Sequence, residues 1–161
     1  MNTMRKLTNA IGLTSPVPTI RKKVGDVLNV TLLADTQGLA VHSIGFDLHY
    51  PANLAYVDDF AGEFDVYTCN RFPYDHLLYI AAEQNTDAKT GDGLTLAGAV
   101  FNCIAPGEGL ILAVEGVQAN RREESGGFTA LPTGHVDAPL AVDAVTDIPD
   151  GAKVIVRVVV E

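Results

Sequence analysis

The feature of this sequence that most limits its fold is an alternation of apolar and polar residues that ends at a proline. Along SIGFDLHY the side chains fall into two sets, Ile44, Phe46, Leu48 and Tyr50 against Ser43, Gly45, Asp47 and His49. Successive side chains of a β-strand point to opposite faces, so residues 43–50 are predicted to form a strand with one face in a core and one in water. Pro51 has no N–H to donate to a neighbouring strand and is expected to end it.

Similar patterns recur along the chain. Further strands are predicted at residues 27–34, 54–57, 76–82, 94–105, 110–119 and 152–161. Turn-forming residues are concentrated at 85–93, 106–109 and 149–151, and no segment of ten or more residues has a convincing helical period. Short strands with a turn every 8–12 residues or so are typical of an all-β sandwich or jelly roll. Residues 120–139 fit either a loop or two short strands.

Two of the predicted strands have features of interior strands. Residues 94–105, LTLAGAVFNCIA, are apolar on both faces, as a central strand would be. The last strand carries Val154, Val156, Val158 and Val160 on one face and Ile155, Arg157 and Val159 on the other. A strand this apolar risks aggregation as a bare edge, so we expect it inside the sheet or covered by another chain.

The charge is unevenly distributed over the 161 residues. Residues 1–23 contain five basic residues and no acidic one, whereas residues 24–161 carry six basic and 20 acidic residues, a net charge of −14. The sequence therefore predicts an extended basic N-terminal arm, 1–23, joined to one acidic sandwich domain, 24–161. An acidic body argues against nucleic acid as a partner.

The composition also bears on location. No apolar run is long enough to span a membrane, and the start of the chain lacks the apolar segment of a secretion signal. We therefore expect a chain that stays in the cytoplasm where it is made. Cys69 and Cys103 are then expected to be free thiols, since they form no CxxC motif.

The body resembles the cohesin-like β-sandwiches. The matching positions are Val24-Gly25-Asp26; Gly38-Leu39-Ala40 through Phe46, Leu48, Tyr50, Pro51 and Leu54; Asp92-Gly93-Leu94 through Phe101; and Leu110 to Asn120. The resemblance covers residues 24–120 and implies a jelly roll of about eight or nine strands. It also implies that the long strand bends at Tyr50-Pro51 and crosses an edge of the sheet. Cohesins bind dockerins on one sheet face.

No group of residues supports a catalytic, cofactor or metal site. His42 and His49 are an odd number of residues apart and would face opposite sides of one strand. The acidic run Asp58, Asp59, Glu63 and Asp65 is interpreted as a solvated loop rather than a calcium site or a carboxylate pair. In the calcium-like loop NTDAKTGDG, Lys89 stands where a third oxygen ligand is needed. A non-enzymatic protein is the prediction.

The function favoured by this profile is a decoration (cement) protein on a bacteriophage head. Such a structural protein would be made in the host cytoplasm and reside in the virion. It would bind the major capsid protein or other shell subunits as a homo-oligomer, with a trimer favoured. The arm would be the anchor, through the predicted partner-binding residues Arg5, Lys6, Leu7, Ile11, Leu13, Val17, Ile20, Arg21, Lys22 and Lys23.

Two alternatives remain open. The first is a cohesin-type module of a larger extracellular scaffold, which would bind a helical, dockerin-like partner on a flat sheet face. The second is a carbohydrate-binding sandwich that uses an aromatic patch of Tyr67, Phe72 and Tyr74. For these three residues the favoured interpretation is packing over an end of the sandwich.

Overall fold

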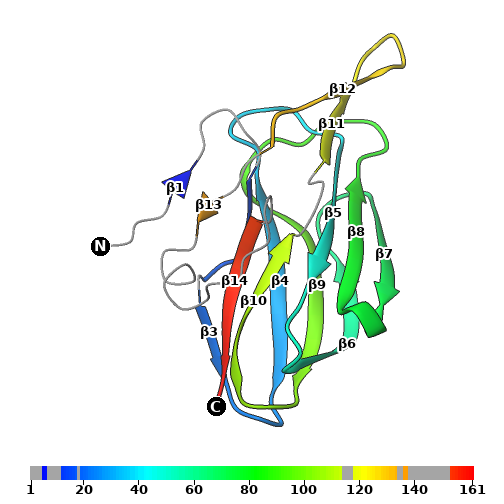
Figure 1. The fold of residues 1–161 in the computed structure, drawn as a ribbon. Helices are drawn as coiled ribbons and strands as arrows, with labels where there is room; N and C mark the ends of the chain where they lie inside the picture. Colours follow the sequence, from blue (N-terminus) through cyan, green and yellow to red (C-terminus); the bar gives the residue numbers. More distant parts are fainter. Residues whose placement is uncertain (1–4, 7–11, 18, 114–117, 134–135, 138–152) are drawn as a thin grey trace.

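Two β-sheets packed face to face make up most of the computed structural model, which describes residues 5–6, 12–17, 19–113, 118–133, 136–137 and 153–161 (Figure 1). In order, the strands of the four-stranded sheet are β2 (Gly12–Thr14), β4 (Val27–Asp35), β9 (Asp92–Cys103) and β6 (Leu54–Ala61). The apolar strand β9 lies inside this sheet, between β4 and β6, which confirms its predicted central position.

The second sheet has eight strands. Six of them form the run β3 (Thr19–Lys22), β14 (Lys153–Val160), β10 (Gly107–Ala113), β5 (Ser43–His49), β8 (Leu77–Glu83) and β7 (Val66–Phe72). β11 (Gln118–Arg122) pairs with the first half of β5 and with β12 (Phe128–Ala130). A separate pair joins β1 (Arg5–Lys6) to β13 (Val136–Asp137). The hairpin β11–β12 projects from the upper end of the sandwich in Figure 1.

The core lies between the two sheets. The inward side chains of β5, Ile44, Phe46 and Leu48, are fully buried, and its outward side chains are only half-buried. The predicted alternation is therefore confirmed. Tyr50 continues the buried set, with its ring 4.9 Å from that of Phe101 on β9. Burial of side chains of this size contributes about 1.5–3 kcal/mol each to stability.

The chain changes sheets at the corner after Tyr50. β5 belongs to the eight-stranded sheet and β6 to the four-stranded sheet, so Pro51 marks the crossing that the resemblance implied. The backbone N–H of Leu54 donates to the carbonyl of Pro51 at 3.1 Å, which closes the turn. A Cβ on Gly109 would lie 2.5 Å from the Cβ of Pro51, so only glycine allows β10 to pass this corner without a shift.

The N-terminal residues differ from the predicted extended arm, 1–23. β2 pairs with β4, and β3 pairs in parallel with β14, so the sandwich begins by residue 12 rather than at residue 24. The physical reason is that these segments complete both sheets: Leu13 is 1% exposed in the core, and Ile20 packs against it. With β3 on its outer side, β14 lies inside the sheet, as its sequence predicted.

The other predicted strands agree in position but not always in extent. The predicted strand at 110–119 is two strands, β10 and β11, on the same side of β5. β7 was missed, because as a sheet edge only its inward residues Tyr67 and Cys69 pack on the core. Residues 120–139 contain β12 and β13. Within the described residues, no helix has the length and apolar character needed to cross a membrane.

Candidate functional site

The outer side of the eight-stranded sheet is covered on one half and open on the other. On β10 and β14, Leu110, Leu112 and Val159 lie outside the core cluster yet are at most 6% exposed. On β5, β8 and β7 the outward side chains are half-buried or exposed along the full length of each strand. The part of the sheet available for contact is therefore the outer side of these three strands, here called the open face.

Strand register arranges the open face in rows. From the upper end of the sheet these are Asn120, Ser43, Glu83 and Val66; Gln118, Gly45, Ala81 and Thr68; Asp47, Tyr79 and Asn70; and His49, Leu77 and Phe72. The second row has the smallest side chains. A Cβ on Gly45 would lie 3.2 Å from the hydroxyl of Tyr79, so this tyrosine leans from β8 over Gly45 on β5. The small side chains of Ala81 and Thr68 lie beside it.

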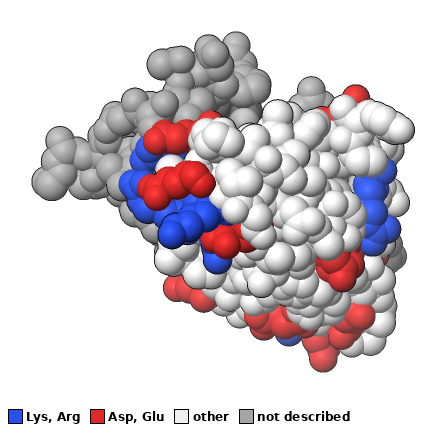
Figure 2. Space-filling view, turned by 90° about the horizontal axis from the view of Figure 1, so that it is seen from below, with Lys and Arg blue, Asp and Glu red and all other residues white. Residues whose placement is uncertain are grey.

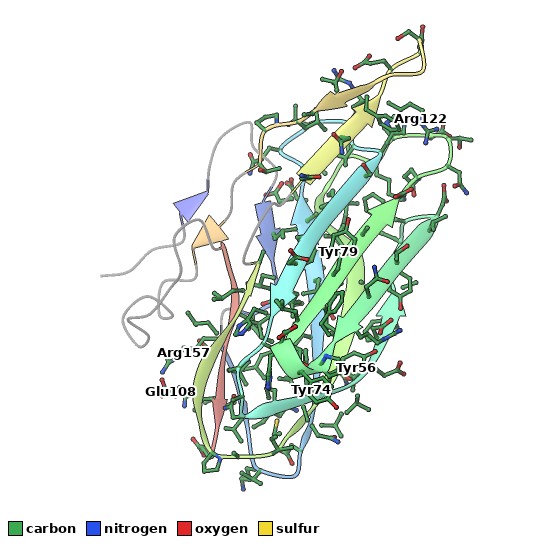
Figure 3. The ribbon with its side chains drawn as sticks, turned by 45° about the vertical axis from the view of Figure 1, so that its right-hand side comes forward. Tyr56, Tyr74, Tyr79, Glu108, Arg122 and Arg157 are labelled. Atoms are coloured by element: carbon green, nitrogen blue, oxygen red, sulfur yellow. The ribbon has the colours of Figure 1, made fainter. Side chains whose placement is uncertain are left out.

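The predicted aromatic patch is not assembled. Tyr74 lies in the short 3-10 turn Pro73–Asp75 and is 99% exposed, at the opposite end of the sheet from Arg122 (Figure 3). Phe72 is also exposed on the open face. Tyr67 points the other way, because it is an odd number of residues from Phe72 on the same strand, and it packs against the core. Of the three rings only Tyr67 packs on the core, and it does so at an edge of the sandwich rather than over an end.

Tyr67 belongs to a cluster that joins the edges of the two sheets. Asp59 on β6 is buried, with a side chain 1% exposed, and accepts hydrogen bonds from the hydroxyls of Tyr56 and Tyr67. Arg71 on β7 donates to the same carboxylate from Nε at 2.9 Å and from Nη2 at 2.7 Å. We call these four residues the Asp59 cluster. It ties β7, the outermost strand of the open face, to β6.

The electrostatics of the Asp59 cluster follow from these bonds. Burial alone raises the pKa of Asp59, but the hydrogen bonds from Tyr56, Tyr67 and Arg71 outweigh it, and the pKa is lowered overall. Burial and the bond to Asp59 raise the pKa of Tyr56 to about 12 and also raise that of Tyr67. Burial, with the nearby Asp59 charge, raises the pKa of the Cys69 thiol to about 12. A carboxylate held in this way is a structural group rather than a proton donor.

A pocket of about 280 Å³ lies at the upper end of the open face. It is lined by His42, Ser43, Glu83, Gln84, Asn120, Arg122 and Phe128. Segments far apart in sequence meet there: the start of β5, the end of β8 and the hairpin β11–β12. The sequence did not predict this pocket, since its residues come together only through strand register. His42 hydrogen-bonds the backbone of both Arg122 and Thr86, contacts that no sequence pattern shows.

The predicted partner-binding residues do not form one surface. Arg5 and Lys6 lie in β1, whereas Leu7 and Ile11 lie outside the described residues. Leu13 is in the core, Ile20 is half-buried against it, and Val17 is exposed. Arg21, Lys22 and Lys23 line a shallow hollow at the lower end with Asp26 and Glu161. Figure 2 views this end from below, and basic and acidic side chains lie together on one side of it.

The acidic run does not form one cluster either. Glu63 accepts from the backbone N–H of Thr95, and Asp65 accepts from that of Asn85, both within 2.9 Å. Asp58 accepts from the backbone N–H of Asp59. Each of these three carboxylates thus accepts a hydrogen bond from a different backbone N–H. Asp58 and Asp59 lie in the strand β6 rather than in a loop. Among the described residues, no three metal-binding side chains are close enough to hold an ion.

Comparisons with known proteins identify the fold. The chain is similar to the seventh ScaB type I cohesin from Pseudobacteroides cellulosolvens, with a TM-score of 0.65, 11% identity, and 94% of this chain and 92% of the other covered. A type I cohesin–dockerin complex (Coh-OlpA-Doc918) from Clostridium thermocellum contains a chain that matches with a TM-score of 0.64 at 13% identity, covering 95% and 100%.

A non-cellulosomal cohesin from the archaeon Archaeoglobus fulgidus matches with a TM-score of 0.60 at 14% identity, covering 91% of each chain. No protein-family model matches the chain, and no curated protein matches it in sequence. The likeness confirms the predicted all-β, cohesin-like jelly roll. It gives no support to the virion decoration protein, its capsid partner or its trimer. The chain therefore has the cohesin fold.

Proposed function

We propose that this chain is a non-enzymatic protein-binding module that docks a partner on its open face. The observation that carries the proposal is the contrast within one sheet: Leu110 and Leu112 are covered, whereas the outward side chains of β5, β8 and β7 are half-buried or exposed. A rigid sheet that presents small side chains beside exposed aromatic rings is suited to shape-complementary contact with another protein.

The proposed partner is a helical, dockerin-like module. Ala81 and Thr68 have small side chains, so a helix can approach β8 and β7 closely there. Tyr79 and Phe72 supply exposed apolar contact beside them. Two of the similar structures support this choice. They are the type I cohesin–dockerin complex from Clostridium thermocellum and the sixth cohesin of Acetivibrio cellulolyticus scaffoldin B in complex with a Cel5 dockerin.

A pair of matched substitutions tests the proposal. Asn70→Arg adds a long charged side chain to the open face, and Asn29→Arg adds the same side chain to exposed β4 on the other sheet. Dockerin modules are titrated into the isotope-labelled chain and followed by NMR. We expect shifts at Gly45, Thr68 and Ala81, binding at least about tenfold weaker for Asn70→Arg, and no change for Asn29→Arg.

A photo-crosslinking residue at position 81 or 29 extends the test to the native source. Docking on the open face predicts that position 81 captures a partner and that Asn70→Arg prevents the capture. Capture of the same partner from position 29 alone would overturn the proposal. So would a partner whose affinity is unchanged by Asn70→Arg.

A further inference from the structure

We propose that the pocket at the upper end of the open face binds a neutral, polyhydroxylated ligand of the size of one sugar ring. This site lies between the hairpin β11–β12 and the end of β8, and it differs in position from the aromatic patch considered from the sequence. Its volume of about 280 Å³ is in the range of small ligand sites. It is a function additional to protein docking.

The charged side chains that line the pocket disfavour both cationic and anionic ligands. Arg122 lines the pocket and differs from the other arginines with described side chains, Arg21, Arg71, Arg121 and Arg157, each of which pairs with a carboxylate. Glu83 lines the same pocket, and no described residue donates a hydrogen bond to its carboxylate. A cation would face Arg122 and an anion would face Glu83, so a ligand without net charge fits best.

The hydrogen-bonding groups around the pocket are of both kinds. Arg122 uses Nη1 and Nη2 to donate to the carbonyls of Asn85 and Gln84, at 2.7 and 3.2 Å, and a guanidinium has further N–H donors. Glu83 offers only acceptors. The side-chain amide of Asn120 donates to Ser43 Oγ at 3.4 Å and keeps its own oxygen as an acceptor. A ligand hydroxyl can both donate and accept, which suits this mixed lining.

Phe128 supplies the apolar surface. Its ring is 64% exposed, and the guanidinium carbon of Arg122 lies 5.9 Å from the ring centroid. An aromatic ring this exposed contributes little to the core, and its face can pack against the C–H face of a sugar ring. Exposed phenylalanine beside convergent polar groups is the combination expected of a small-ligand site.

The walls of the pocket are held in place before any ligand arrives. The buried His42 accepts the backbone N–H of Arg122 at Nδ1 (2.8 Å), and its Nε2 donates to the carbonyl of Thr86 (3.0 Å), an assignment made from these two partners. Gln84 donates to the carbonyl of Asp87 and accepts from the backbone N–H of Asp65. A preformed site avoids the ordering cost of binding.

The test is an NMR titration of the isotope-labelled full chain with methyl glycosides of glucose, mannose and galactose. At least one should give saturable shifts at the amides of Asn120, Arg122 and Phe128, with millimolar affinity. Phe128→Ala and Glu83→Gln should each weaken that binding by about tenfold or more. Tyr74→Ala removes a still more exposed ring outside the pocket and should change nothing.

Three outcomes would overturn the proposal: no saturable shift with any of the glycosides, binding that survives Phe128→Ala, or tighter binding of acetate, methylammonium or zwitterionic glycine. Asn70→Arg separates this function from docking. It should weaken partner binding and leave glycoside binding unchanged, because Asn70 lies two rows from the pocket.

Discussion

Replacing Asp59 with asparagine is expected to weaken the join between the two sheets. The substitution keeps the shape of the side chain but removes a buried charge that accepts bonds from Tyr56, Tyr67 and Arg71. A hydrogen bond to a charged group contributes about 1.5–3 kcal/mol. The asparagine oxygen can keep one of these bonds, and Arg71 is half-exposed and regains water. We therefore expect Asp59→Asn to lower the free energy of unfolding at neutral pH by about 2–3 kcal/mol.

Urea denaturation measured at several pH values gives the sharper test. Because the pKa of Asp59 is lowered in the folded chain, its contribution is present above the pKa of the unfolded chain and is lost as the pH falls through the folded value. The difference between the wild type and Asp59→Asn should therefore be largest near pH 7 and shrink below about pH 4. At about 2 kcal/mol per M, the neutral-pH effect is a midpoint shift of about 1 M urea.

Two controls complete this experiment. Tyr67→Phe removes one donor and leaves the carboxylate paired, so it should cost about 1 kcal/mol. Asp58→Asn changes the neighbouring carboxylate, which among the described residues accepts just the backbone N–H of Asp59, and should cost less than Asp59→Asn. Two results would contradict this prediction: a free energy of unfolding for Asp59→Asn within about 0.5 kcal/mol of the wild-type value at pH 7, or an effect of the substitution that is the same at every pH.

Three further predictions concern other parts of the chain. Leu13→Ala should lower the free energy of unfolding, measured in urea, by about 2–5 kcal/mol, because Leu13 on β2 is buried in the core. An unchanged urea midpoint would mean that residues 1–23 form an arm outside the core. The pKa of the Cys69 thiol is raised to about 12, so at pH 8 it should resist iodoacetamide in the folded chain and react in urea. Mass spectrometry measures the labelling, and fast labelling of the folded chain would contradict this prediction. Light scattering after gel filtration tests the predicted homo-oligomer. A monomer at all concentrations would contradict the predicted trimer.

The sandwich could be predicted because alternation depends on local geometry. β5 and β9 carry their patterns in their own residues, and a strand with one buried face needs nothing more to be recognised. β7 could not be found in this way. Its residues VYTCNRF alternate little in polarity, since an edge strand has exposed positions on both sides, such as Val66 and Arg71.

The N-terminal strands were missed for a different reason. Pro16, Pro18 and the basic residues suggested an extended arm, but two short strands need only one or two core contacts when the neighbouring strands already exist. Leu13 supplies one such contact and Ile20 another. The sheet, rather than the local sequence, stabilises these segments, so local pattern could not reveal them.

The charge distribution shows most clearly why the site could not be read from the sequence. A basic arm and an acidic body suggested that function lay where the basic residues are concentrated. In the folded chain Arg21 lies within 3.9 Å of Glu161, so part of that charge has an acidic neighbour. Among the arginines with described side chains, the one without a carboxylate partner is instead Arg122, in the acidic body and fixed by two backbone carbonyls. What marks the pocket is this arginine together with Glu83 and Phe128, and strand register rather than local sequence brings the three together.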